Sequence, residues 1–434
     1  MESERIILKN EVMRRAICIF AFAAMAVMAN AQVTAGTEKQ IYLPEDLRTL
    51  RLDSDTSQWC WQRSAQTRDL IFMWQRGFGN DLQAPPPLEG KNMAVNLSVL
   101  MDRVQSFYTF FRDTLRFSLP GSKADRYKMM VMLNYSLDGT AYGGTYDNFI
   151  GALWVAPNRI QDKTMNCLAH ELGHSFQAQI MADSIGQAWG GSGFFEMTSQ
   201  WMLWQVNPWW LRDENYHLEA FKGLTHKAFL ALENIYHSPY VIQWWSDLHG
   251  RESIAQLYRE GRIGEDPVMT YMRKYGLSQK AFNEEMLRGY QHLVDFDFKH
   301  ARRETRPYAC QWSTPLDTLR GGWMKPKNAL EAYGFHIIPL PTSCRGVKVK
   351  GKGKGVLYAL VGVDADGTCH YGGIGQTGLD VAPQRLRHLF LVVMGAPQRH
   401  RQLSMPHEGE MGSVETFSYQ LRQCRSLPDT WRKR

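Results

Sequence analysis

The stretch His170-Glu171-Leu172-Gly173-His174 carries residue types that can bind a metal ion and move a proton. Apolar residues recur around it at steps of three and four, which predicts a helix with its N-cap at Asp162. Histidines four positions apart share one helix face, with Cβ atoms about 5–6 Å apart. That spacing suits two ligands of one Zn²⁺ ion and leaves Glu171 beside the metal as a catalytic base. The alternative, two unrelated histidines on a wet face, is disfavoured by the apolar surroundings and by Gly173, which leaves room for a neighbouring backbone.

A third ligand is expected, because a catalytic zinc ion takes three protein ligands and keeps one position open. Glu196 follows His174 by 22 residues, in an aromatic and apolar segment that predicts a second helix over 194–205. A buried carboxylate without a partner is costly, and a metal ion supplies that partner. We therefore expect His170, His174 and Glu196 to be the metal ligands. The alternative for Glu196 is an ion pair on a surface helix.

His-Glu-Leu-Gly-His followed by a glutamate on a second helix resembles the gluzincin group of HExxH zinc metallopeptidases. In that group the glutamate helix often reads Glu-x-x-x-Asp, and here Gln200 stands at the aspartate position. Gln200 can still accept a hydrogen bond from an imidazole, without a charge. Several stretches also resemble an exported bacterial family of metallopeptidase-like proteins that carries only a domain-of-unknown-function label: 55–60, 150–155, the predicted metal helix, 200–205 and 391–397.

The resemblance implies an α+β fold. A zincin-like catalytic unit, with a small mixed sheet and a mainly helical part, would precede a β-sandwich-like C-terminal domain. It also implies hydrolysis of peptide bonds in proteins or glycoproteins, with zinc-activated water and Glu171 as the base. The strand over 149–155 is expected to form the rim of the cleft and to pair with an extended substrate.

The donor that stabilises the oxyanion is expected on a later segment. We favour His226, because it falls within the helix that the pattern predicts over 215–235. The candidates are His217, His226, Tyr236, His237 and Tyr240.

Residues 1–31 predict a cleavable signal peptide. Arg14 and Arg15 precede the apolar run 16–28, and Ala29-Asn30-Ala31 is a small-x-small cleavage site. The run is too short for a comfortable membrane span, so we expect a secreted or periplasmic protein cleaved after Ala31. Seven cysteines fall to six after cleavage, contain no Cys-x-x-Cys pair and leave the disulfide pattern open.

The rest of the chain divides by its patterns into a lead-in over 32–57, a metallopeptidase domain over 58–300 and a β-rich accessory domain over 301–434. Short strands are expected at 70–74 and 127–135, and a helix at 92–117. Gly139 to Gly144 reads as a turn, and Asp364 to Gly367 as a hairpin. In the last domain strands are expected at 347–355, 356–363, 388–394 and 415–420.

Charge is spread unevenly along the chain. Residues 301–434 carry 20 Lys and Arg against 10 Asp and Glu, whereas residues 32–300 carry a net charge of −4. A run of lysines alternates with Val and Gly, so that all would share one face of a strand: Lys348, Lys350, Lys352 and Lys354. They either bind an anionic glycan or protect a sheet edge from pairing, and edge protection is the default. We expect no nucleic-acid partner.

Two other functions stay open from the sequence. A glycan- or glycoprotein-binding protein with weak or no catalysis would rest on the 14 tryptophans, the basic C-terminal domain and the uncharged Gln200. A zinc amidase acting on peptidoglycan would use the same metal chemistry. A cluster of tryptophans after Glu196 could line a subsite, but packing in the core is the favoured interpretation: Trp201, Trp204, Trp209 and Trp210.

Overall fold

The computed structural model describes residues 38–190, 192–344, 346–351, 355–376, 378–379, 385–402 and 414–424. The chain divides into two compact units, residues 1–40 and residues 41–434. Only residues 38–40 of the first unit are described, so the predicted signal peptide lies outside the described residues. Among the described helices, none combines the length and the apolar character that a membrane crossing requires.

A mixed five-stranded sheet opens the second unit, in the order β1-β2-β3-β5-β4. Strands β2 (Leu70–Trp74), β3 (Met129–Leu133) and β5 (Ile150–Val155) run parallel, while β1 (Ser64–Gln66) and β4 (Ala141–Tyr146) are antiparallel. Every residue of β2 and β3 is buried, as their unbroken apolar runs require of parallel strands covered on both faces. The strands predicted at 70–74 and 127–135 are confirmed, as is the α+β fold class.

The expectation for the rim strand is wrong. β5 is paired on both sides, with β3 and with β4, so its backbone has no free edge. The edge strand next to β5 is β4, which falls on the segment that its glycines had indicated as a turn. Gly143 and Gly144 both lie in the strand itself. Helix α5 (Asn166–Ala182) packs against Gly143 too closely for a larger side chain, whereas the atoms nearest to Gly144 belong to the Tyr142 ring of the same strand.

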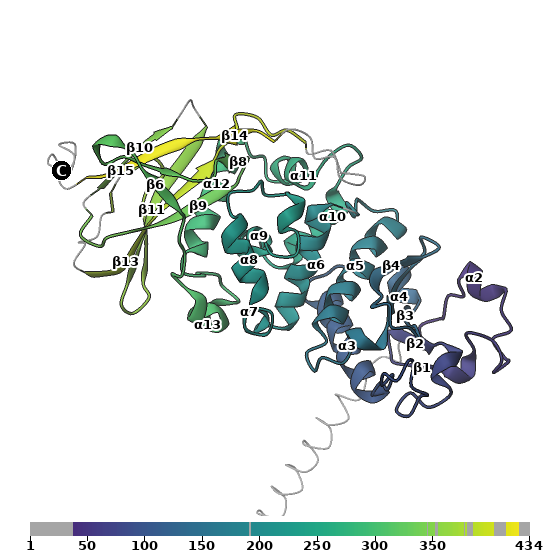
Figure 1. Cartoon of the computed structure of the whole chain (residues 1–434). Coiled ribbons are helices and arrows are strands. Elements are labelled where there is room, and N and C mark those ends of the chain that lie inside the picture. Colours follow the sequence, from purple (N-terminus) through teal and green to yellow (C-terminus); the bar gives the residue numbers. More distant parts are fainter. Residues whose placement is uncertain are drawn as a thin grey trace, which may run out of the picture. The chain divides into compact units, whose positions relative to one another are not determined.

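Helices dominate the chain from residue 166 to residue 305 (Figure 1). The helices that precede this region in the chain are α2 (Glu45–Arg48), α3 (Leu97–Asp113) and α4 (Lys123–Arg126). The helices between residues 166 and 305 are α5, α6 (Gly193–Val206), α7 (Trp210–Asp213), α8 (Tyr216–Leu224), α9 (Tyr240–His249), α10 (Glu252–Glu260), α11 (Pro267–Lys274), α12 (Gln279–Leu293) and α13 (Arg302–Thr305).

Three predicted helix boundaries need correction. α5 begins three residues later than expected, because the Asp162 carboxylate caps the turn before it, accepting from the Thr164 N–H at 2.9 Å. α3 begins at Leu97 rather than at residue 92, where the Asn96 side chain accepts from the Val99 N–H at 3.1 Å. The helix predicted over 215–235 ends at Leu224, so its second half is a loop with one 3₁₀ turn.

The C-terminal strands form two four-stranded sheets and a two-stranded one. One has the order β10-β15-β7-β6, one β12-β11-β13-β9, and β14 pairs with β8. Side chains from both larger sheets meet in one buried apolar cluster, which includes Val347, Leu421, Ile338 and Leu391. Their bounds are β6 (Leu316–Thr318), β7 (Met324–Pro326), β8 (Leu330–Glu331), β9 (Phe335–Leu340), β10 (Gly346–Gly351), β11 (Val356–Asp364), β12 (Cys369–Tyr371), β13 (Leu386–Gly395), β14 (Thr416–Phe417) and β15 (Tyr419–Cys424).

These strands match the predicted ones to within a few residues, and β11 and β12 form the expected hairpin at Gly367, whose φ is 85°. Helix α12 joins the second sheet to the helices: the Gln291 side-chain amide donates to the carbonyl oxygens of Leu360 and Gly372 at 3.1 Å each. The sandwich architecture and the domain boundary at residue 301 stay predictions.

We predict that Gly143→Ala destabilises the protein. A Cβ at this position of β4 would lie 1.8 Å from the Glu171 carbonyl oxygen, so α5 or β4 must shift. We expect the free energy of unfolding in urea to fall by about 1–3 kcal/mol. Gly223→Ala on α8 is the matched control, because its Cβ would meet no atom within 4 Å. An unfolding curve for Gly143→Ala equal to that of the control would contradict the packing described here.

Candidate metal centre

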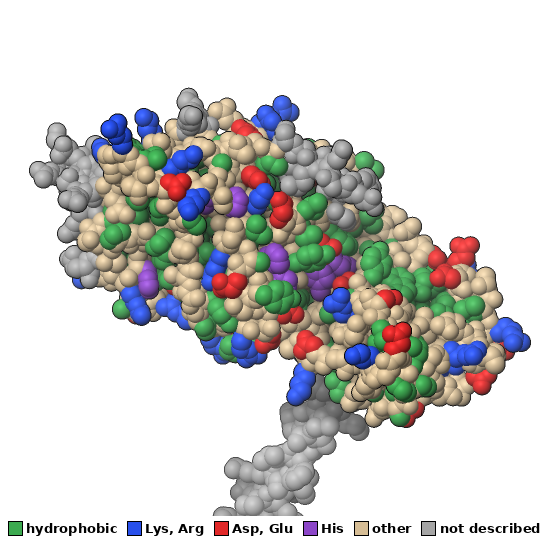
Figure 2. Space-filling model, in the orientation of Figure 1, with side chains coloured by type: hydrophobic (Ala, Val, Ile, Leu, Met, Phe, Trp, Pro, Cys, Tyr) green, Lys and Arg blue, Asp and Glu red, His purple; other side chains and the backbone are tan. Residues whose placement is uncertain are grey.

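The two histidines of the motif converge on one point. His170 and His174 are both buried on α5, and their Nε2 atoms lie 3.0 Å apart. The two rings are perpendicular to each other, with centroids 4.6 Å apart. Histidine side chains gather on the face shown in Figure 2, over the region of α5, α6 and α8. The predicted pair therefore lies together as a ligand pair must.

Glu196 completes the cluster from the first turn of α6. Its Oε2 lies 3.1 Å from the Nε2 of His170 and 3.1 Å from that of His174. Zinc bonds of about 2.0–2.1 Å in tetrahedral geometry separate neighbouring ligand atoms by roughly 3.3 Å. The three atoms thus form a triangle of nearly the required size, and they are the one group of this kind among the described residues. The residues fit a single metal ion.

Glu196 and the imidazoles of the cluster interact electrostatically, and this interaction shifts the pKa values of Glu196 and His170. Burial alone would raise the pKa of Glu196, but hydrogen bonds with His170 and His174 outweigh it and lower that pKa to about 2. Burial likewise disfavours a charged His170, yet Glu196 and the nearby Glu171 raise the pKa of this imidazole. A site that favours positive charge on the His170 imidazole is one that a metal cation can occupy instead of a proton.

Two glutamines orient the imidazoles. The Gln200 Oε1 lies 2.8 Å from the Nδ1 of His170, and the Gln177 Oε1 lies 2.8 Å from the Nδ1 of His174. An amide oxygen only accepts, so each Nδ1 must carry a proton. Each Nε2 is then the ring nitrogen that could bind a metal, which would displace the proton that it donates to Glu196. Gln177 is itself held, because its amide donates to the Phe195 carbonyl oxygen and the Tyr258 hydroxyl at 2.9 and 2.8 Å. Sequence reasoning found the position of Gln200 but not the role of Gln177.

Close packing of α6 on α5 brings Glu196 to the histidines. Gly173 faces Ser199 so closely that a Cβ there would lie 2.5 Å from the serine hydroxyl oxygen. That hydroxyl donates to the His170 carbonyl oxygen, which joins α6, one turn after Glu196, to the backbone of His170 on α5. The Phe195 ring also stacks on the His174 imidazole, with centroids 4.2 Å apart. Gly173 therefore provides the close backbone approach that the sequence indicated.

Two further polar groups border the cluster. Glu171 projects from α5 next to His170, and both Glu171 and Glu196 act on the Tyr236 hydroxyl. Burial, and then these two charges, raise the pKa of Tyr236 to about 12. The Tyr236 ring centroid is 5.9 Å from that of His170. The hydroxyl therefore stays protonated at neutral pH and can donate a hydrogen bond.

His226 lies elsewhere. Its carbonyl oxygen accepts from the Glu331 N–H at 2.9 Å, and its ring centroid is 6.5 Å from that of His336. These contacts tie it to β8 and β9, and no contact with the ligand cluster occurs within the described part of the chain. The helix expected over 215–235 would have included His226, but α8 ends before it. We therefore replace His226 by Tyr236 as the candidate oxyanion donor.

The other candidates have different surroundings. The Nδ1 atoms of His217 and His237 lie 2.7 Å apart, and Tyr240 is buried among aromatic rings. Three of the clustered tryptophans are buried, as the core-packing interpretation predicted, whereas Trp209 is 39% exposed. Burial raises the pKa of the Cys167 thiol to about 12, which is typical of an inert cysteine one turn before a ligand.

The fold and the site together define a mixed α+β protein whose His-Glu-x-x-His helix presents a His–His–Glu cluster able to hold one metal ion. The chain belongs to the family described as "Family of unknown function (DUF6055)", whose model matches residues 33–428. This match confirms the resemblance to a family with a domain-of-unknown-function label, and the gluzincin resemblance stays a prediction.

Comparison with curated proteins and with solved structures gives no strong match. No curated protein matches the chain. Among solved structures, the chain is similar to the catalytic module of the metalloprotease ZmpA from Clostridium perfringens, with 10% identity and a TM-score of 0.28 over 83% of this chain and 68% of that chain. Because this similarity is weak, the functional argument rests on the site.

We predict that Gln200→Leu weakens zinc binding. Without the Oε1 acceptor the His170 ring loses its fixed tautomer and orientation, which typically weakens metal affinity about 10–100-fold. Competition with a chromophoric chelator measures the change. Gln205→Leu on the same helix is the control, because that amide donates to Gln243 and not to a ligand. Equal zinc affinities of the two variants would show that Gln200 does not orient the site.

Proposed function

We propose that this protein is a secreted zinc metallopeptidase that hydrolyses peptide bonds in proteins or glycoproteins. The observation that carries the proposal is the triangle of two imidazole nitrogens and one carboxylate oxygen at 3.0–3.1 Å, with the Glu171 carboxylate beside it. Two histidines and a glutamate are a known ligand set of catalytic zinc. A catalytic domain over 58–300 and an accessory domain over 301–434 are part of this proposal.

When bound, zinc supplies Lewis acidity, which lowers the pKa of a water and polarises a carbonyl group. The chain supplies the rest of the chemistry. Glu171, whose neighbour His170 is a ligand, accepts a proton from the attacking water on a carboxylate oxygen and donates it to the leaving amine nitrogen. His170, His174 and Glu196 stay in place through Gln200, Gln177 and the α5–α6 contact, so that no reorganisation is needed during the reaction.

Tyr236 is the proposed oxyanion donor. Its hydroxyl carries a proton at neutral pH, because burial and the two carboxylates raise its pKa. Its ring is 44% exposed and 5.9 Å from the His170 ring between centroids, so a substrate can approach both groups. Hydrogen bonds that strengthen as charge develops on the substrate oxygen are the largest common contribution to such reactions.

The edge strand β4 is the proposed docking site for an extended peptide. It crosses the metal helix at the motif, since a Cβ on Gly143 would lie 1.8 Å from the Glu171 carbonyl oxygen and 2.8 Å from the His174 Cβ. Its outer edge can pair with a substrate backbone, as in other cases of strand addition. The Tyr142 side chain on this strand is 62% exposed and lies against Trp154, with ring centroids 5.7 Å apart.

Glu171→Gln and Glu196→Ala are expected to fail in different ways. Glu171→Gln should keep about one zinc per chain and lower peptidase activity about 10²–10⁴-fold, because only the base is lost. Glu196→Ala should lose both zinc and activity, because a ligand is removed. Zinc is measured by mass spectrometry and activity with protein and mucin substrates.

Glu219→Gln is the control, since this 58% exposed carboxylate on α8 pairs only with Lys222 among the described residues. Full activity of the Glu171→Gln enzyme would exclude Glu171 as the base.

Tyr236→Phe is expected to lower kcat about 10²–10³-fold and to leave KM and zinc content nearly unchanged, because the hydroxyl acts mainly in the transition state. Tyr358→Phe, a partly buried tyrosine on β11, serves as the control. A kcat for Tyr236→Phe equal to that of the control would exclude the proposed donor.

Two alternatives make different predictions. A zinc amidase for peptidoglycan would need the same ligands and Glu171, but it would release peptides from cell-wall fragments and not from proteins. A glycan-binding protein without catalysis would bind its ligand equally well as wild type and as Glu171→Gln, with no hydrolysis by either. The arrangement of Glu171, Tyr236 and the β4 edge around the cluster favours the peptidase.

A further inference from the structure

The solvent face of the sheet β10-β15-β7-β6 carries two cross-strand rows of polar side chains. Lys350 on β10 pairs with Gln420 on β15, and the antiparallel register places Lys325 of β7 on the far side of Gln420. The second row joins Lys348, Arg422 and Trp323, and the Arg422 guanidinium lies 5.2 Å from the Trp323 ring centroid. Directly opposite side chains on neighbouring strands lie about 4.5–5.5 Å apart, so each row is continuous.

The cations of this face have no acidic partner in an ion pair. In the part of the chain that the structure describes, none of the recorded ion pairs includes Lys325, Lys348, Lys350 or Arg422. One carboxylate, that of Asp317, lies opposite Lys325 on the neighbouring strand β6. The face therefore keeps a net positive charge.

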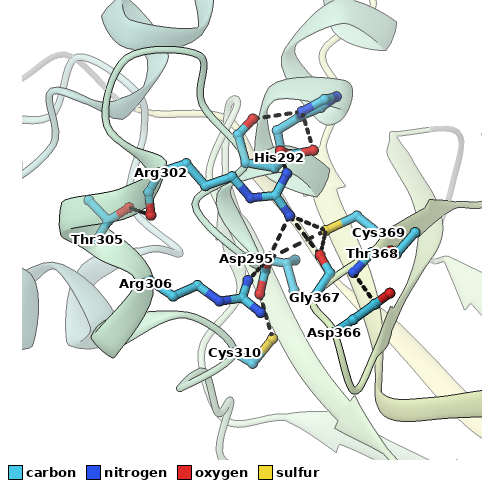
Figure 3. A network of polar contacts seen from close by, with 12 residues as sticks. His292, Asp295, Arg302, Thr305, Arg306, Cys310, Asp366, Gly367, Thr368 and Cys369 are labelled. Carbon is cyan, nitrogen blue, oxygen red and sulfur yellow. Dashed lines mark hydrogen bonds and ion pairs between the residues drawn. The ribbon is translucent and has the colours of Figure 1, made fainter.

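A second basic region differs in this respect. Arg302 and Arg306 both form ion pairs with the Asp295 carboxylate, at 3.3 and 2.5 Å (Figure 3). Arg303 pairs with Glu304 at 2.7 Å. Because its own carboxylates neutralise that region, it is a weaker candidate for binding an external anion.

The first row opens into a groove of about 300 Å³. The residues that line it are Lys325, Lys350, Gly351, Ser418, Tyr419 and Gln420. A volume of this order is typical of ligand sites, and the groove offers charges together with neutral hydrogen-bonding groups. Lys and Arg side chains gather over β10 and β15 at the upper left of Figure 2.

Protection of a sheet edge from pairing explains only some of the cations on this face. β10 is an edge strand, so Lys348 and Lys350 are where that explanation expects them. Lys325 and Arg422, however, lie on β7 and β15, which are both paired on two sides. Strands inside a sheet need no protection from pairing, so cations on them call for another role.

We propose that this groove and the adjoining row bind an anionic glycan, a polysaccharide with sulfate or uronic acid groups. Lys325 and Lys350 flank Gln420 in the strand register, so anionic groups can meet cations while sugar hydroxyls meet Gln420 and Ser418. Single-stranded nucleic acid is disfavoured, because it needs an open aromatic platform and Arg422 covers the Trp323 ring. The site is separate from the metal centre and does not depend on the proposed peptidase activity.

The test is binding of the full-length protein to heparin across a salt series, with neutral dextran, an oligo-dT strand and anionic phospholipid vesicles as comparison ligands. Heparin should bind, and Lys325→Ala/Lys350→Ala should weaken it about tenfold and lower the slope of log K against log salt by about 2. Lys91→Ala/Lys280→Ala removes two exposed lysines elsewhere and matches the net charge, so it should bind like wild type.

Zinc content and circular dichroism report whether each variant folds, and Lys350→Ala alone replaces the double variant if that one does not. Three results would overturn the proposal: no heparin binding by the wild type, equal weakening by the two lysine pairs, or binding to oligo-dT or vesicles as tight as binding to heparin. Loss of peptidase activity in Glu171→Gln with heparin binding unchanged separates this proposal from the proposed function.

Discussion

The Glu196 carboxylate, held between two buried imidazoles, is the interaction on which the rest of this structure depends. Removing a carboxylate from water is costly, and here His170 and His174 compensate for that cost at 3.1 Å each. The compensation requires α5 and α6 to approach closely, which Gly173 permits and the Ser199 hydroxyl secures. On the opposite side β4 comes equally close through Gly143. Two glycines therefore set the position of the ligand helix from both sides.

Neutral amides hold the imidazoles of this site. A carboxylate acceptor at either Nδ1 would add negative charge to a site that already contains Glu171 and Glu196. Gln200 and Gln177 fix the same tautomer without that charge, and Gln177 connects the site to the Phe195 carbonyl and to Tyr258 in the core. Orientation is preserved, whereas the increase in imidazole basicity that an acidic partner gives is smaller. The cluster could therefore hold a metal ion through its geometry more than through excess charge.

The local patterns of the sequence were sufficient for the metal helix, the Glu196 helix and the buried strands β2 and β3, because each is decided by its own apolar period. The features that were predicted wrongly depend on contacts between residues far apart in the sequence. Glycines at 143 and 144 indicated a turn, but both lie in β4, where Gly143 is in close contact with α5. His226 was favoured from an expected continuous helix, yet hydrogen bonding of its carbonyl to Glu331 anchors it to β8, and the loop after it brings Tyr236 to the cluster. Neither tertiary contact leaves a signal in a single sequence.

X-ray absorption at the zinc edge, on the protein loaded with one equivalent of zinc, tests the central claim most directly. We predict only nitrogen and oxygen neighbours at about 2.0–2.2 Å, with the outer-shell signature of two imidazoles and no sulfur at about 2.3 Å. That result would place zinc on His170, His174 and Glu196 and leave Cys167 unbound. A sulfur neighbour, or a spectrum with no imidazole, would contradict the site described here.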